Sequence, residues 1–118
     1  MVMNNYLKIS VLIPSFNPGK YLIEAVESIN SSAKQPAEII IVDDCSSDGL
    51  SFEIAKDLEA RFSNIKVLQT PRNLGAMHAR KIGIEHSSYD YLFCLDADDY
   101  LDQDALELAQ LLLALQYF

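Results

Sequence analysis

Residues 38–49 read EIIIVDDCSSDG, and the predicted fold depends on this segment. Glu38–Val42 is a mostly apolar run rich in β-branched residues, which is typical of a parallel strand buried on both faces. The next seven residues, DDCSSDG, are dense in turn-forming residues. The segment therefore predicts a buried strand that ends directly at a polar, acidic loop.

The same pattern of strand, polar loop and helix recurs along the chain. The other predicted strands are Leu7–Ile13, which stops at Pro14, Ile65–Gln69 and Tyr91–Leu95. Apolar residues at helical spacing follow each strand and predict helices over residues 20–32, 50–62, 74–84 and 102–115. Four strand–helix units in series predict an α/β fold with a doubly wound, mostly parallel sheet of about four strands, Rossmann-like, in a single domain over residues 1–118.

The ends and faces of the later helices are also predicted. Asn73 is a candidate N-cap of the third helix. One side of that helix is traced by Leu74, Met77, Lys81 and Ile84. Asp102 is a candidate cap of the fourth helix, with Asp104 favourable in its first turn.

Composition limits the classes of function. The chain has 118 residues, half of them hydrophobic, and a formal net charge of -8, which argues against binding to nucleic acid or to an anionic membrane surface. Its two cysteines, Cys45 and Cys94, are too few for a disulfide scaffold. The first residues have no signal-peptide pattern, and no apolar run reaches the ~18–20 residues of a membrane span. These features predict a cytoplasmic globular protein.

Three polar loops each begin where a predicted strand ends. They contain Pro14–Asn17, the pair Asp43 and Asp44, and Asp96–Asp99. In open α/β sheets, ligands bind outside the carboxyl ends of the strands, at the point where strand order reverses. We therefore expect these three loops, which come from three separate units, to meet in one crevice.

The third loop has the composition of a cation site. Asp96 and Asp98 flank a single residue, so both carboxylates can project to the same side of the chain. Mg²⁺ or Mn²⁺ prefers oxygen ligands, and Mg²⁺ typically takes one or two carboxylates together with phosphate oxygens. Arg80 and Lys81 have the charge needed to reach a diphosphate. For the aspartates, the alternative is an acidic turn that caps the next helix. For Arg80 and Lys81, the alternative is a solvated basic helix face.

Two other acidic architectures fit less well. An EF-hand calcium loop counted from Asp96 would place Leu101 where a glycine is required, after a strand instead of a helix. A phosphoacceptor receiver domain also starts with an acidic pair after an apolar strand. Here the pair follows the second strand instead of the first.

Four ordered segments resemble the family 2 glycosyltransferases, which have the GT-A fold. They are SVLIPSFNPGKYLIEAVESI (10–29), EIIIVDDCSSDG (38–49), RNLGAMHARKIGI (72–84) and YLFCLDADD (91–99). The resemblance implies metal-dependent, inverting transfer of a sugar from a nucleotide diphosphate sugar, UDP-linked, to the hydroxyl of a glycan or lipid-linked acceptor. It does not specify the sugar.

The resemblance also implies roles for individual residues. Those implied at the nucleotide are Pro14, Ser15, Phe16, Asn17, Asp43, Asp44, Asn73, Arg80 and Asp96. Among them, Asp44 is implied to accept a hydrogen bond from uracil. Asp96 and Asp98 match the family's Asp-x-Asp motif, with Asp98 as a direct ligand of Mn²⁺ or Mg²⁺ and Asp96 nearer the ribose.

The chain departs from the family's pattern after Asp99. The family's domain is considerably longer, and its later part carries the acceptor site and the general base. We therefore expect this chain to be the donor-binding half, inactive by itself, of an enzyme that is cytoplasmic or peripheral to the membrane. The apolar segment Leu106–Phe118 predicts homo-oligomers. A non-catalytic α/β module of receiver or ion-binding type, which would ignore the nucleotide, is the alternative from another functional class.

Overall fold

Four parallel strands form one sheet in the computed structural model, which describes residues 8–32 and 34–115. In chain order the elements are β1 (Ile9–Ser15), α1 (Tyr21–Asn30), β2 (Glu38–Asp43), α2 (Ser51–Arg61), β3 (Ile65–Gln69), α3 (Ala76–His86), β4 (Tyr91–Cys94) and α4 (Ala105–Leu115). The strand order is β3-β2-β1-β4, and every neighbouring pair is parallel. The predicted doubly wound parallel fold is confirmed.

Strand order reverses between β1 and β4. The chain steps from β1 to β2 to β3 in one direction and then returns to place β4 on the other side of β1. β1 pairs with β4 only as far as Leu12, but with β2 as far as Ser15. β1 and β4 therefore separate beyond Leu12. Pro14 lies past the last pair with β4, where its missing N–H interrupts no pairing with that strand, so β1 continues two residues beyond its predicted end at Ile13.

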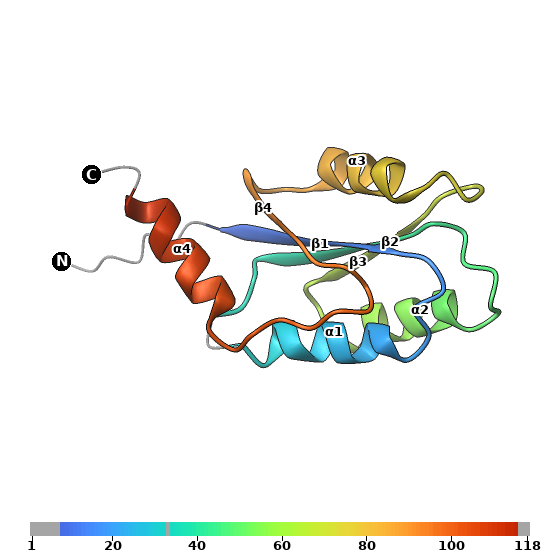
Figure 1. Ribbon diagram of the computed structural model, residues 1–118, viewed down its shortest axis with the longest axis horizontal. Helices are drawn as coiled ribbons and strands as arrows, with labels where there is room; N and C mark the ends of the chain where they lie inside the picture. The colour runs from blue at the N-terminus through green and yellow to red at the C-terminus, as the bar shows by residue number, and fades with distance from the viewer. Residues whose placement is uncertain (1–7, 33, 116–118) are drawn as a thin grey trace.

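Helices cover both faces of the sheet (Figure 1). α1 and α2 lie on one face and α3 on the other. The larger core cluster joins strand residues such as Val11, Ile13, Ile39 and Ile41 to the buried sides of α1 and α2. A smaller cluster on the opposite face consists of Leu12, Ile40 and Val42, packed with Ala79 of α3. The long apolar strands β1 and β2 are thus buried on both faces, as predicted.

β4 differs from its predicted form. It is an edge strand that ends at Cys94, and its residues alternate between half-buried and exposed. Leu92 and Cys94 pair beside Ser10 and Leu12, and so share the face of the sheet on which α3 packs. α3 packs over β1 and β2, which leaves this face of β4 open. β4 is therefore one residue shorter than the predicted strand Tyr91–Leu95, and only the face with Tyr91 and Phe93 packs against the core.

The start of α3 was also predicted incorrectly. The helix begins at Ala76, and Gly75 precedes it with a φ of 99°. That φ is in the region that favours glycine. Asn73 therefore lies in the exposed loop before the helix and is not its N-cap.

The face of α3 that meets the sheet combines two small buried residues with the partly buried Ile82. Ala79 and Gly83 are its buried residues, whereas Met77 is 80% exposed and Ile84 is 52% exposed. A Cβ added at Gly83 would lie 1.9 Å from Cδ1 of Leu12, so the buried Leu12 side chain would have to move to admit a larger residue there. The side traced by Leu74, Met77, Lys81 and Ile84 is therefore not the side of α3 that packs on the sheet.

α4 lies beside the amino end of the sheet (Figure 1). It begins at Ala105, directly after Asp104, so Asp102 is not its cap. One side of the helix buries Leu106, and the other exposes Leu108, Leu111, Leu112 and Leu115. Among the described residues, no helix has the length and hydropathy needed to cross a membrane.

Candidate functional site

A cleft opens where β1 and β4 separate. Its main cavity has a volume of about 370 Å³ and is lined by Pro14, Phe16, Asn17, Pro18, Tyr21, Asp96, Ala97 and Asp98. A smaller hollow of about 100 Å³ shares three of these residues and is lined by Pro14, Ser15, Phe16, Asp44, Ala76, Ala79 and Asp96. The predicted convergence of three loops at the reversal of strand order is therefore confirmed. Neither cavity is lined by Asp43 or Asn73.

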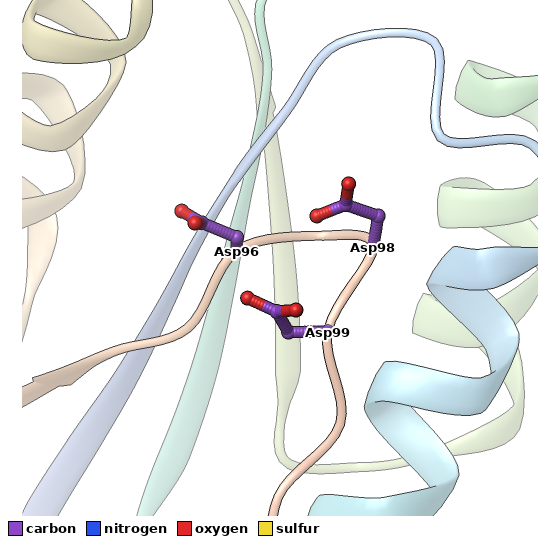
Figure 2. Close-up of side chains that lie close together, drawn as sticks. All are labelled: Asp96, Asp98 and Asp99. Carbon is purple, nitrogen blue, oxygen red and sulfur yellow. The ribbon is translucent and has the colours of Figure 1, made fainter.

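Three of the predicted acidic residues form a cluster. Asp96, Asp98 and Asp99 project from a single turn after β4 (Figure 2). One carboxylate oxygen from each lies within 4.8 Å of those of the other two, and all three side chains are exposed. The turn is closed by the Asp99 N–H, which donates to the Asp96 carbonyl oxygen at 3.0 Å. Three oxygen donors at this separation fit a hard divalent cation such as Mn²⁺ or Mg²⁺.

A strand, β4, precedes this turn, so the cluster is not part of an EF-hand. The next three acidic residues along the chain, Asp102, Asp104 and Glu107, do not belong to the group that lies close enough to share an ion. The acidic stretch therefore divides into a cluster at the cleft and a second set at the start of α4.

Arg80 places a positive charge next to the acidic cluster. The Nη2 atom of Arg80 lies 3.6 Å from Oδ1 of Asp96, and both side chains are about half exposed. In water-exposed surroundings such a pair contributes little to stability. Its importance is positional: α3 brings a guanidinium group, which suits phosphate oxygens, to the rim of the cleft.

Asp44 is buried, and its carboxylate anchors the loop before α3. It is 3% exposed. Oδ1 accepts from the Thr70 hydroxyl at 2.8 Å and the Leu74 N–H at 2.9 Å, and Oδ2 accepts from the Gly75 N–H at 2.8 Å. A carboxylate has about four acceptor positions, so three are already used within the protein. Asp44 borders the smaller hollow, and its proposed bond to uracil remains a prediction.

Asp43 is fully buried and organises a different loop. Its carboxylate accepts from the Ser46 N–H at 3.1 Å, the Ser46 hydroxyl at 2.6 Å and the Gln69 side-chain amide at 3.2 Å. Asp43 lines neither cavity. The structure therefore gives it a supporting role, without direct access to the cleft.

Asn17 combines a place in the cleft with a structural role. Its Oδ1 atom accepts from the Ser47 N–H at 2.8 Å and the Asp48 N–H at 3.2 Å. Its Nδ2 atom donates to the Ser47 hydroxyl at 3.1 Å. The β1–α1 loop is thus bonded to the β2–α2 loop through one amide side chain.

Two residues of the main cavity lie outside the loops predicted from the sequence. Pro18 and Tyr21 line the main cavity, and Tyr21 is 61% exposed at the first position of α1. A usable signal existed, because the first turn of a helix that follows a strand-end loop must lie at the same edge of the sheet. The sequence pattern marked Pro18 only as a turn residue.

Comparison with known proteins agrees with this arrangement. The sequence profile described as Glycosyl transferase family 2 matches residues 10–114. An uncharacterized glycosyltransferase of Haemophilus influenzae is 37% identical over 99 residues, which cover 84% of this chain and 39% of that protein. The chain spans about a third to two fifths of the length of the first curated relatives that it matches.

Two solved structures extend the comparison to three dimensions. The crystal structure of S. aureus TarS 1–349 in complex with UDP matches with a TM-score of 0.82 and 27% identity, covering 94% of this chain and 33% of that one. The structure of GalNAc-T7 with UDP, GalNAc and Mn²⁺ matches with a TM-score of 0.69 and 30% identity, covering 79% of this chain and 18% of that one. The sheet and helices described above are thus similar to part of each.

Proposed function

Because the chain belongs to glycosyl transferase family 2, we propose that it binds the nucleotide-sugar donor of a metal-dependent, inverting glycosyltransferase. The observation that carries this proposal is the position of three clustered carboxylates at the cleft where strand order reverses. UDP is the proposed nucleotide because the similar TarS is described in complexes with UDP and UDP-GlcNAc. Mn²⁺ or Mg²⁺ is the proposed cation because GalNAc-T7 is described with Mn²⁺ and because the cluster offers oxygen donors.

Each part of the cleft has a place in this proposal. Asp98 and Asp96 hold the cation, and Arg80 supplies a fixed positive charge beside them for the phosphates. Phe16 and Tyr21 supply aromatic surface suited to a planar base. A bound cation would stabilise the negative charge that develops on the diphosphate leaving group as its bond to the sugar breaks.

The acceptor in this proposal is a hydroxyl group of a glycan or a lipid-linked sugar. For inversion, that hydroxyl attacks the sugar carbon from the side opposite the diphosphate, and a base removes its proton. We assign no residue between 8 and 115 to the base. The proposal for this chain is therefore limited to holding the donor and its cation.

Calorimetric titration tests the proposal directly. UDP and Mn²⁺ should each bind weakly alone and more tightly together, because phosphate oxygens complete the coordination of the ion. A chelator should reverse the gain. If UDP binds equally well with and without the chelator, the metal-dependent part of the proposal is wrong. A chain that ignores UDP under all conditions would match the alternative of a non-catalytic module.

We also propose that the exposed side of α4 mediates homo-oligomers. Its four exposed leucines, Leu108, Leu111, Leu112 and Leu115, follow helical spacing and form a continuous apolar stripe. Light scattering over a concentration series should show association of the wild type and its loss in Leu111→Glu. Ile84→Glu is the matched control, because Ile84 and Leu111 are both 52% exposed. A wild type that stays monomeric at every concentration would refute this proposal.

A further inference from the structure

The β1–α1 loop forms one wall of the cleft. Besides the Asn17 side-chain bonds described above, two similar relays of hydrogen bonds attach it to the β2–α2 loop and the start of α2. In the first, the Asn17 N–H donates to the Ser46 hydroxyl oxygen at 2.9 Å. The same hydroxyl donates to Oδ1 of Asp43 at 2.6 Å. Asp43 is itself fixed, because it is fully buried and accepts two further bonds. The relay therefore ends on a rigid acceptor.

The second relay repeats this chemistry two residues further along the loop. The Gly19 N–H donates to the Ser51 hydroxyl oxygen at 2.8 Å. That hydroxyl donates to Oδ2 of Asp48 at 2.6 Å. Asp48 also accepts from the backbone N–H groups of Leu50 and Ser51, at 3.0 and 2.8 Å. Ser51 is fully buried, so the bond is protected from competition by water.

Both relays require a group that accepts and donates at the same time. Among small side chains only a hydroxyl does so, which explains why the bridging residue is serine in each case. Alanine at Ser46 or Ser51 would break two bonds at once. Threonine at Ser46, which is half-buried, would keep both.

Two residues of this loop have a left-handed backbone conformation. Asn17 has a φ of 54° and Gly19 a φ of 58°, both in the left-handed region. Such a conformation is uncommon for a residue other than glycine, although asparagine tolerates it best. Bonds from outside the loop therefore select this conformation from those available to the free segment. Asn17 and Gly19, whose N–H groups donate the first bond of each relay, are also the two residues of this loop that have a positive φ.

The conformation of this loop decides the shape of the cleft. Phe16, Asn17, Pro18 and Tyr21, which line half of the main cavity by residue count, lie in the loop or directly beside it. Ser46 and Ser51 line neither cavity. Their contribution to a ligand in the cleft must therefore pass through the loop.

We propose that Ser46 and Ser51 are positioning residues, which hold residues 16–20 in the conformation that binds the nucleotide. This inference rests on the proposed function for the identity of the ligand, and on the two relays for its mechanism. Without either hydroxyl, the loop samples other conformations and only a fraction of molecules is competent to bind. The apparent affinity falls in proportion to that fraction.

The experiment compares UDP binding in the presence of Mn²⁺ by four chains: wild type, Ser46→Ala, Ser51→Ala and Ser46→Thr. Each alanine variant should bind UDP about tenfold more weakly if about a tenth of its molecules retain the loop conformation. Ser46→Thr should bind within about twofold of wild type, because the hydroxyl is kept. Ser63→Ala, at an exposed serine between α2 and β3, is the matched control and should bind as wild type does.

Two further measurements separate positioning from a general loss of stability. Amide hydrogen exchange at Asn17 and Gly19 should accelerate in the alanine variant of the corresponding relay, while exchange in β2 stays unchanged. The pKa of Asp48 lies below its ordinary value, chiefly because of the hydrogen bond from the Ser51 hydroxyl. Ser51→Ala should therefore raise the pKa of Asp48 in a carboxyl NMR titration, and Ser46→Ala should leave it unchanged.

The outcomes are distinguishable. Alanine variants that bind UDP as tightly as wild type, or that show unchanged exchange at Asn17 and Gly19, would overturn the inference. A wild type that fails to bind UDP would contradict the proposed function and, with it, the nucleotide part of this inference. Accelerated exchange in β2 as well as in the loop would show that the serines stabilise the fold as a whole, which also overturns a positioning role.

Discussion

Mn²⁺ and uridine diphosphate added together should raise the melting temperature of this chain by roughly 5–10 °C. A ligand that binds only the folded state stabilises it by RT ln(1 + [L]/Kd), about 2.7 kcal/mol at a hundredfold excess over Kd. The reason to expect a large effect is electrostatic. Asp96, Asp98 and Asp99 hold like charges within 4.8 Å of one another, and the cation removes their repulsion.

Two substitutions locate the effect. Asp98→Asn should abolish the metal-dependent part of the shift, because it removes a charged ligand without changing the size of the side chain. Asp102→Asn is the matched control, since Asp102 is an exposed aspartate outside the cluster, and it should keep the full shift. Thermal melts with metal, nucleotide, both or neither provide the measurement. If wild type shows no shift with both ligands, or Asp98→Asn keeps the whole shift, the cluster is an acidic turn without a cation.

Asp44→Ala should lower the free energy of unfolding by about 3–5 kcal/mol, because each buried donor left without an acceptor costs about 1–3 kcal/mol. Two backbone donors, the N–H groups of Leu74 and Gly75, depend on this carboxylate, whereas the Thr70 hydroxyl can turn to the Arg72 carbonyl oxygen, 2.7 Å away. Asp44 is 3% exposed, so water is a poor replacement for its carboxylate as an acceptor. The loss is comparable to the whole stability of many domains, which is about 5–15 kcal/mol.

Urea denaturation measures this effect, and Asp99→Ala provides the comparison. Asp99 is an exposed acid at the same cleft, and its removal should change stability by less than about 0.5 kcal/mol. Asp44→Asn should fall between the two, because one carboxylate oxygen is replaced by a group that donates instead of accepting. Equal stabilities of Asp44→Ala and Asp99→Ala would show that the buried bonds do not anchor the loop before α3.

The sequence was sufficient to predict the fold and the location of the site, for a physical reason. β-Branched apolar runs such as Glu38–Val42 predict buried parallel strands, and successive strand–helix units force right-handed crossovers. The carboxyl ends of parallel strands then share one edge of the sheet. The meeting of Asp96 and Asp98 with Pro14 follows from connectivity, before any side-chain contact is known.

The sequence was not sufficient to predict the roles of individual polar residues. Nothing local distinguishes the buried acceptor Asp44 from the exposed Asp98, since each is an aspartate just after a strand. The difference arises because the loop before α3 folds over Asp44, whereas the loop after β4 leaves Asp98 in solvent. The same limitation explains the error at α3, where the close contact of Gly83 with Leu12 depends on size and not on hydropathy.

The separation of β1 from β4 beyond Leu12 has a consequence for the changes that this cleft can tolerate. Because the opening is created by the divergence of two backbones, its location does not depend on any one side chain. Phe16, Pro18 and Tyr21 line the opening but do not create it. Substitutions at these residues should change the lining of the cleft but not its location in the fold. Residues that line the cleft can therefore be exchanged one at a time in an engineered chain while the opening itself is kept.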